Sequence, residues 1–107
     1  MKGEALKGHL DLLLLAGLAE RPAHGYALVE TLRSRSSGAF DLPEGTLYPA
    51  LHRLEESGMV ASQWNEEHGR RRRVYHLTAR GRKNLAQRQM DWQKFAQAVN
   101  GVVEGMA

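Results

Sequence analysis

The hydrophobic period of this chain changes twice, and those changes restrict the folds open to it. Residues 5–20, 24–36 and 44–56 place apolar side chains three and four positions apart, as one face of a helix does. Residues 59–67 and 71–78 instead alternate polar residues with valine, tryptophan and tyrosine, which predicts two short strands. From about residue 79 to about residue 104 the helical period returns. The predicted order is therefore three helices, a hairpin and a long helix.

Capping and turn residues support these boundaries. Asp41 or Leu42 is expected to cap the third helix, with Pro43 in its first turn. Ser57-Gly58 is expected to end that helix, and Thr78 to cap the last one. Three helices followed by a two-stranded hairpin is the winged helix-turn-helix arrangement. The predicted fold class is thus mainly α with a small β-hairpin (α+β), extended by a long C-terminal helix.

Length and composition exclude several classes of protein. The chain has 107 residues, which suits one compact domain, and it lacks cysteine, which excludes disulfides and thiolate metal sites. Its longest apolar run, LLLLAGLA at 12–19, is too short to span a bilayer, and the N-terminus has no signal-peptide pattern. We therefore expect a cytoplasmic protein with no membrane partner.

The sequence gives no positive sign of catalysis. No glycine-rich phosphate loop follows a predicted strand, and no serine or carboxylate pair is placed for catalysis. The five histidines lack the paired spacing of a zinc-binding helix. We expect no enzyme activity, no cofactor and no metal.

The charge of the chain is unevenly distributed. The formal net charge is +3, but residues 1–69 hold six Lys/Arg against ten Asp/Glu, whereas residues 70–107 hold nine against two. A basic block of this kind is typical of a protein with a polyanion partner. A solvated basic face explains the charge alone equally well.

Four consecutive arginines stand at the tip of the predicted hairpin. Because strand side chains alternate, two should face one way and two the other, so that both sets could bind a phosphate backbone. Their mutual repulsion is costly unless an anion is near. The alternative is that the arginines form a charged strand edge that prevents pairing with another sheet. Four consecutive arginines are more than such edge protection requires. The candidate DNA contacts are Arg70, Arg71, Arg72 and Arg73.

The third predicted helix turns its leucines inward and several polar or rigid residues outward. In a helix-turn-helix the second helix of the pair lies in the major groove, where hydroxyls and arginine meet phosphates and base edges. The alternative is that Tyr48 is half-buried, Pro49 shapes the helix and Arg53 pairs with Glu56. The candidate DNA contacts here are Thr46, Tyr48, Pro49 and Arg53.

The start of the second helix is a further candidate contact. A helix N-terminus attracts anions, so His24, Gly25 and Tyr26 could meet a phosphate. The alternative is that Tyr26 packs against the domain and His24 caps the helix. The residues alone leave these two interpretations even.

The last helix carries an apolar seam with a spacing of seven residues, from Leu85 through Trp92 and Val99 to Met106. At about 39 Å for about 26 residues it is longer than a small domain can cover, so a partner helix from a second copy is expected. The alternative is that it folds back over its own domain. The expected dimer interface comprises Leu6, Leu10, Leu13, Leu85, Trp92, Phe95, Val99 and Val102.

Three stretches together resemble the PadR-like family of bacterial transcriptional regulators. They are LKGHLDLLLLAGLAERPAHGYALVETLR, LPEGTLYPALHRLEESGMVAS and GRRRRVYHLTARGR, in this order, between about Leu6 and Trp92. The resemblance implies a homodimeric winged-helix repressor that binds a palindromic operator in double-stranded DNA. It also implies a DNA-binding domain over residues 1–78 and a dimerisation helix over residues 79–107 that packs on the same domain.

The resemblance further implies a candidate effector site at Trp92. Some family members bind small aromatic ligands between their subunits, and a tryptophan in the last helix can stack on them. The alternative is that Trp92 is plain interface core. Two other functions compete with DNA binding: a winged-helix protein-interaction module, and a small-molecule sensor without sequence-specific DNA binding.

Overall fold

The structure, a computed structural model, describes residues 8–105. The described residues form four helices and three strands, and the predicted order of three helices, a hairpin and a long helix is confirmed. The elements are α2 (Leu10–Leu18), β1 (Ala23–His24), α3 (Gly25–Arg35), α4 (Glu44–Glu56), β2 (Val60–Glu67), β3 (Arg70–Leu77) and α5 (Ala79–Glu104). Leu6 of the expected dimer interface and Met106 of the apolar seam lie outside the described residues.

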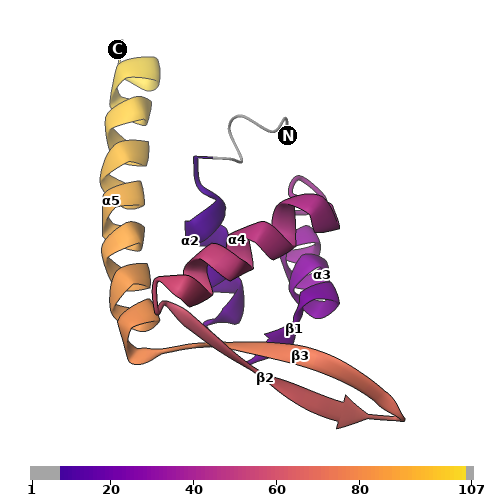
Figure 1. Cartoon of the computed structure of the whole chain (residues 1–107). Helices are drawn as coiled ribbons and strands as arrows, with labels where there is room; N and C mark the ends of the chain where they lie inside the picture. The colour runs from indigo at the N-terminus through magenta and orange to yellow at the C-terminus, as the bar shows by residue number, and fades with distance from the viewer. Residues whose placement is uncertain (1–7, 106–107) are drawn as a thin grey trace.

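The elements form a compact head with two extensions (Figure 1). Helices α2, α3 and α4 gather above the hairpin, whose far end reaches beyond them, while α5 stands at the opposite edge (Figure 1). This is the winged helix-turn-helix predicted from the sequence, with α3 and α4 as the helix pair and β2–β3 as the wing.

Leucines from the three short helices make the core. The inward face of α4 is confirmed: Leu47, Leu51 and Leu54 are all buried, because a spacing of three and four residues keeps them on one side. They meet residues from α2, α3 and the sheet. The most deeply buried large side chains are Leu14, Leu15, Leu18, Leu28, Leu47, Leu51 and Val60.

The sheet has one strand more than predicted. Its order is β1-β3-β2, and β1 pairs antiparallel with β3 through Ala23 opposite Tyr75 and His24 opposite Val74. The hairpin turns through His68 and Gly69, whose φ angles of 51° and 75° are both positive. Two-residue turns of that hand match the twist of the flanking strands.

The start of α4 differs from the prediction. Pro43, not Asp41 or Leu42, occupies the N-cap position, and its carbonyl accepts from the N–H groups of Thr46 and Leu47. Leu42 is buried in the core instead, and Asp41 pairs with Arg33 at 2.7 Å. Burial of an apolar side chain and an ion pair therefore outweigh the local preference for a capping aspartate.

The end of α4 is as predicted. Gly58 has a φ of 79°, its N–H donates to Glu55 O at 3.0 Å, and Met59 N–H donates to Leu54 O at 2.9 Å. This pair of bonds is the Schellman motif, which favours glycine at the left-handed position. It turns the chain directly from α4 into β2.

Helix α5 is fixed to that turn. Thr78 caps it as predicted, accepting from Gly81 N–H at 3.0 Å, while its hydroxyl lies 2.6 Å from Gly58 O and can donate to it. Gly81 is buried so close to Met59 that a Cβ atom would overlap the Met59 carbonyl. The direction of α5 is therefore set at the junction of α4 and β2, the α5 joint (Gly58, Met59, Thr78 and Gly81).

Two residues of the expected dimer interface lie inside the chain. Leu10 and Leu85 are buried in the core, because α2 and the first turns of α5 pack on the same domain. Beyond Leu85 the helix is largely exposed, including Trp92, Phe95, Val99 and Val102. Within residues 8–105 no helix is long and apolar enough to cross a membrane.

Candidate nucleic-acid interface

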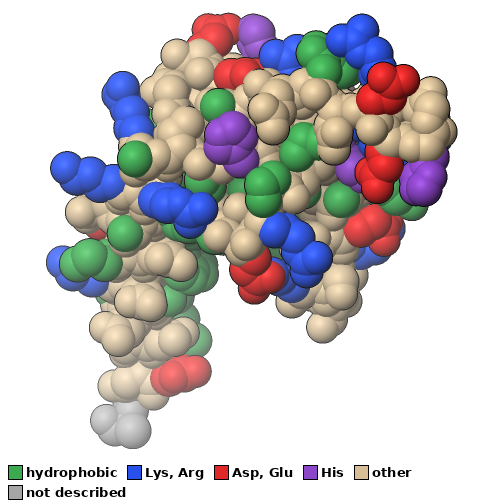
Figure 2. All heavy atoms as spheres, turned by 90° about the horizontal axis from the view of Figure 1, so that it is seen from below, with side chains coloured by type: hydrophobic (Ala, Val, Ile, Leu, Met, Phe, Trp, Pro, Cys, Tyr) green, Lys and Arg blue, Asp and Glu red, His purple; other side chains and the backbone are tan. Residues whose placement is uncertain are grey.

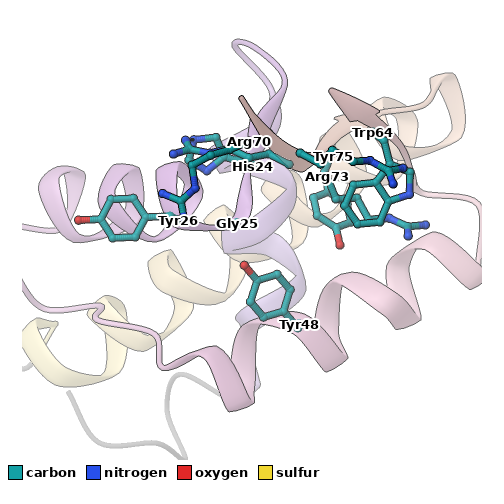
Figure 3. Close-up of a pocket in the computed structure, with 10 residues that line it drawn as sticks. His24, Gly25, Tyr26, Tyr48, Trp64, Arg70, Arg73 and Tyr75 are labelled. Atoms are coloured by element: carbon teal, nitrogen blue, oxygen red, sulfur yellow. Dashed lines mark hydrogen bonds between the residues drawn. The ribbon is translucent and has the colours of Figure 1, made fainter. Parts of the chain in front are cut away.

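A hollow of about 650 Å³ lies where the start of α3, the middle of α4 and the hairpin meet. Tyr48 extends from α4 with its hydroxyl toward the start of α3, while Trp64, Arg73 and Tyr75 gather on the hairpin side (Figure 3). The hollow is lined by His24, Gly25, Tyr26, Tyr48, Trp64, Arg70, Arg71, Arg72, Arg73 and Tyr75. The structure thus brings together eight of the residues proposed from the sequence as DNA contacts.

Tyr48 is both packed and exposed. A Cβ atom on Gly25 would lie only 2.5 Å from the Tyr48 hydroxyl oxygen, so the absence of a side chain on Gly25 makes room for the ring. The side chain nevertheless remains 43% exposed. One edge of the ring therefore packs on α3, and the rest is available to a ligand in the hollow.

His24 caps α3 and also contacts the hairpin. Ala27 N–H donates to its Nδ1 at 3.3 Å, and Arg72 Nη1 lies 2.8 Å from its Nε2. Burial lowers the pKa of His24, Arg72 lowers it further, and Glu67 partly opposes them. A protonated ring could accept neither contact, whereas each neutral tautomer has one accepting nitrogen and can accept either from Ala27 or from Arg72. The predicted capping role is confirmed.

Tyr26 does not pack in the interior. Its side chain is 69% exposed at the first turn of α3, although it belongs to the lining of the hollow. The alternative prediction, that Tyr26 packs against the domain, is therefore wrong. An aromatic hydroxyl held at a helix N-terminus beside a cluster of arginines is suited to contact an anion.

The hairpin arginines alternate as predicted. Arg71 and Arg73 lie over the Trp64 ring, with guanidinium carbons 4.7 Å and 5.5 Å from its centroid, while Arg72 faces His24. The register sets Glu66 opposite Arg71 and Glu67 opposite Arg70. Basic and acidic side chains also lie close together on the face seen in Figure 2. The expected repulsion among the arginines is thus partly offset within the chain.

Trp64 and Tyr75 belong to the site but were not predicted. Trp64 is 56% exposed, a large apolar surface in the middle of a charged hairpin. Tyr75 on β3 is buried, and its pKa is raised by that burial. The signal that could have found them is register: in a two-residue hairpin, Trp64 falls opposite Arg73 and Ser62 opposite Tyr75.

Three proposed contacts lie outside the hollow: Thr46, Pro49 and Arg53. Pro49 and Arg53 are exposed on α4. Arg53 Nη2 lies 3.9 Å from Asp11, and that carboxylate also lies 3.6 Å from Arg88 of α5. The proposed Arg53–Glu56 pair is wrong, because Glu56 pairs with His52 at 2.6 Å.

Helix α4 is not a basic helix. It carries Glu44, Glu55 and Glu56 against a single arginine. Contacts with a phosphate backbone gain affinity from neutralised charge, so α4 can contribute little to sequence-independent binding. Among the candidate contacts, the cations suited to that kind of binding are mainly those of the hairpin.

A second hollow, of about 360 Å³, lies between the start of α2 and α5. Trp92 meets His9 edge-on at 5.0 Å between ring centroids, and Phe95 lies 6.1 Å from Trp92. Arg88 and Asp91 add charge to its wall. Among residues 8–105 no group of three or more His, Asp or Glu side chains is gathered as metal ligands would be.

The helix pair, the wing and the arginine hairpin define the class of winged-helix DNA-binding proteins. Residues 14–87 match the model of the transcriptional regulator PadR-like family. The chain belongs to this family, whose members are transcriptional regulators and not enzymes.

Individual relatives agree with this assignment. The chain is 37% identical to the transcriptional regulator Rv3488 of Mycobacterium tuberculosis over 98 residues, which cover 92% of this chain and 89% of the relative. It superposes on a PadR family transcriptional regulator from Eggerthella lenta with a TM-score of 0.80 at 34% identity, covering 94% and 87% of the two chains. A transcriptional regulator from Clostridium thermocellum gives a TM-score of 0.84 at 29% identity, covering 94% and 95%.

Proposed function

We propose that this protein is a homodimeric transcriptional repressor that binds a palindromic operator in double-stranded DNA in the cytoplasm. The observation that carries the proposal is the hollow in which Tyr48, the start of α3 and the arginine hairpin converge. Two helices and a basic hairpin then face one ligand. A DNA duplex offers a groove and a phosphate backbone to such a surface at the same time.

In the proposed complex α4 enters the major groove. The half-buried Thr46 and the exposed Tyr48, Pro49 and Arg53 meet base edges and the groove wall. The start of α3 at His24, Gly25 and Tyr26 meets a phosphate. The hairpin arginines bind the flanking backbone, which supplies most of the salt-dependent affinity. This assignment of phosphate contacts to the hairpin and base contacts to α4 is consistent with the acidic composition of α4.

The proposed dimer forms through residues 79–107, which extend from the DNA-binding domain of residues 1–78. The exposed apolar side chains of α5 would be covered by the same helix of a second copy, with Leu13 of α2 at the margin. Covering them accounts for the side chains Trp92, Phe95, Val99, Val102 and Val103, which are all at least 40% exposed in the single chain.

We also propose that a small aromatic ligand releases the repressor from DNA. The hollow beside Trp92 supports this part of the proposal, because it combines stacking surfaces with the charged groups of Arg88 and Asp91. A ligand there would lie against both α2 and α5, the two helices that would form the dimer. It could then change how the two DNA-binding domains are held.

Selection of bound duplexes from a random pool tests the proposal. We expect enrichment of one motif with two-fold symmetry, because a dimer presents two identical surfaces. Tyr48→Ala should weaken binding to that motif more than binding to unrelated duplex, with Lys83→Ala on the outer face of α5 as the matched control. A pool that yields no enrichment, even in dilute buffer, would overturn the proposal.

Titration of the protein with the selected duplexes distinguishes DNA binding from a protein-interaction role. Affinity for a duplex should fall steeply as salt rises, because bound phosphates release counterions. A winged-helix module that binds protein through α4 would show neither that dependence nor a symmetric motif. Sensor activity without DNA binding would appear as quenching of tryptophan fluorescence by planar aromatic compounds alone.

A further inference from the structure

The four hairpin arginines differ in what already binds them. Two have partners on the helices of the domain, and two do not. DNA phosphates compete with any partner that an arginine has in the free protein. The two arginines without such partners are therefore more available to bind phosphates. If the protein binds DNA as proposed, the four arginines therefore have separate roles within the basic hairpin.

Arg73 is bound on three sides. Its Nε donates to Ser62 Oγ at 2.7 Å, its Nη2 lies 3.5 Å from Glu55 Oε1, and its guanidinium lies over Trp64. Ser62 in turn donates to the other oxygen of Glu55 at 2.6 Å. Glu55 is in the last turn of α4, so these contacts join the DNA-reading helix to both strands of the wing.

Arg72 is bound on the opposite face of the hairpin. Its Nη1 lies 2.8 Å from His24 Nε2, and His24 is the cap of α3. This contact and the pairing of β1 with β3 hold the wing against the start of α3. Arg72 is also less exposed than the other three arginines.

Arg70 and Arg71 keep their donor groups open. The Arg70 guanidinium has no ion pair or hydrogen bond with the described residues, although Glu67 lies opposite Arg70 in register. Arg71 lies over the Trp64 ring at 4.7 Å, and stacking of this kind occupies the face of a guanidinium while its N–H edge stays free. Both side chains are exposed near the hairpin turn.

We propose that Arg72 and Arg73 are positioning residues that fix the wing to α3 and α4, and that Arg70 and Arg71 are the arginines that bind DNA phosphates. Trp64 then has a role as well. It holds Arg71 in a defined orientation beside the anchored Arg73, which reduces the ordering that a phosphate would otherwise impose.

The salt dependence of operator binding tests the division. Each lost phosphate contact flattens the slope of log K against log salt by about 0.9, so Arg70→Ala or Arg71→Ala should flatten it by about 1.8 in a dimer with two wings. Arg72→Ala and Arg73→Ala should change that slope by less than half as much. They should lower affinity by a nearly salt-independent factor, about two- to fivefold.

Thermal unfolding without DNA supplies the second readout. Arg73→Ala should lower the Tm by about 2–5 °C, whereas Arg70→Ala should leave it unchanged or raise it. In a Glu55→Gln background the effect of Arg73→Ala should shrink, since its main ionic partner is gone. Likewise, His24→Asn keeps a residue able to cap α3 but removes the partner of Arg72, so adding Arg72→Ala should then have little effect.

Failure of the inference and failure of the proposed function look different. Equal flattening of the slope by all four substitutions, with no coupling to Glu55 or His24, would overturn the division of roles while DNA binding stands. Absence of duplex binding by the unsubstituted protein would overturn the proposed function itself, and the unfolding measurements would still report whether Arg72 and Arg73 hold the wing.

Discussion

Tyr48 keeps its position because Gly25, on a neighbouring helix, has no side chain. The hydroxyl end of the ring occupies the space that a Cβ atom would need. Neither residue alone suggests this relation, since Gly25 begins α3 and Tyr48 lies within α4, more than twenty positions later. The pair links the two helices at the place where DNA contact is proposed.

Gly25→Ala should therefore damage binding more than folding. The added methyl group forces the Tyr48 ring away from α3, and we expect a loss of stability of about 1–3 kcal/mol together with weaker operator binding. Gly45→Ala, in open space on α4, is the matched control and should not lower the Tm. Chemical denaturation and operator titration measure the two effects. Operator affinity unchanged in Gly25→Ala would contradict the role given to Tyr48.

His24 should make stability depend on pH. Its pKa is lowered in the folded chain from an ordinary value of 6.5, by burial first and by Arg72 second. A group with a lowered pKa binds fewer protons when folded, so its contribution is present above pH 6.5 and is lost as pH falls through the folded pKa. Urea unfolding of the unsubstituted chain should show this loss on acidification.

His24→Asn is the control for that measurement, because asparagine can cap a helix without titrating. The stability difference between the two proteins should favour histidine more at pH 7.5 than at pH 5.5. A difference that stays constant over this range would show that His24 does not sense protons through its contacts.

Part of the candidate site can be predicted from residue identity. The basic run and the outward face of α4 were visible in the sequence, because they depend on charge and helical period. Trp64 was missed, since an aromatic in a strand is usually counted toward the core and only register places it under two arginines. The partners of Arg53 were also mispredicted, because Asp11 is distant in sequence and reaches it only after α2 and α4 pack.

At the scale of elements, the α5 joint shows why the longest helix was also the easiest to predict. Thr78 marks the start of the helix as its cap, and the apolar period indicates how far the helix continues. Both ends can therefore be predicted from residues close in sequence. Strand β1 was not predicted because two residues carry no period; pairing with β3 alone defines it. The predicted N-cap of α4 is wrong for a similar reason. Burial of Leu42 in the core, which is a tertiary contact, determines where the helix begins.

Gly81→Ala should be strongly destabilising. A methyl group there overlaps the backbone carbonyl of Met59, which cannot move without disturbing the end of α4, and we expect a loss of about 2–3 kcal/mol. Gly101→Ala, in open space on the same helix, should instead stabilise by about 0.5–1 kcal/mol. Denaturant titration compares them. Equal stabilities for the two variants would mean that the joint is looser than its packing indicates.

At the scale of the whole molecule, the single chain is more extended than its length requires. Its radius of gyration is 15.4 Å and its extents are 60 × 28 × 21 Å. A compact chain of this length has a radius of gyration of about 13 Å. The difference comes from α5 and the hairpin, which project from the head (Figure 1). A stripe of exposed valines and aromatics on a projecting helix is typical of a surface that another protein covers.

Acidic substitutions on that helix should abolish the proposed dimer. Val99→Glu combined with Val102→Glu places charges in the apolar stripe, and we expect a monomer by sedimentation equilibrium at micromolar concentration. Gln97→Glu, on the opposite side of α5, is the matched control and should leave association unchanged. If the double variant sediments like the unsubstituted protein, α5 is not the interface.

The α5 joint has a consequence for the DNA that such a dimer would accept. Since each long helix leaves its domain in a fixed direction, the place where two of them cross determines how far apart the two major-groove contacts lie. Sliding that crossing by one helical turn moves a domain by about 5.4 Å, or roughly one and a half base pairs. Substitutions near the C-terminus, far from any nucleotide, would then alter the preferred half-site spacing and leave the half-site sequence unchanged.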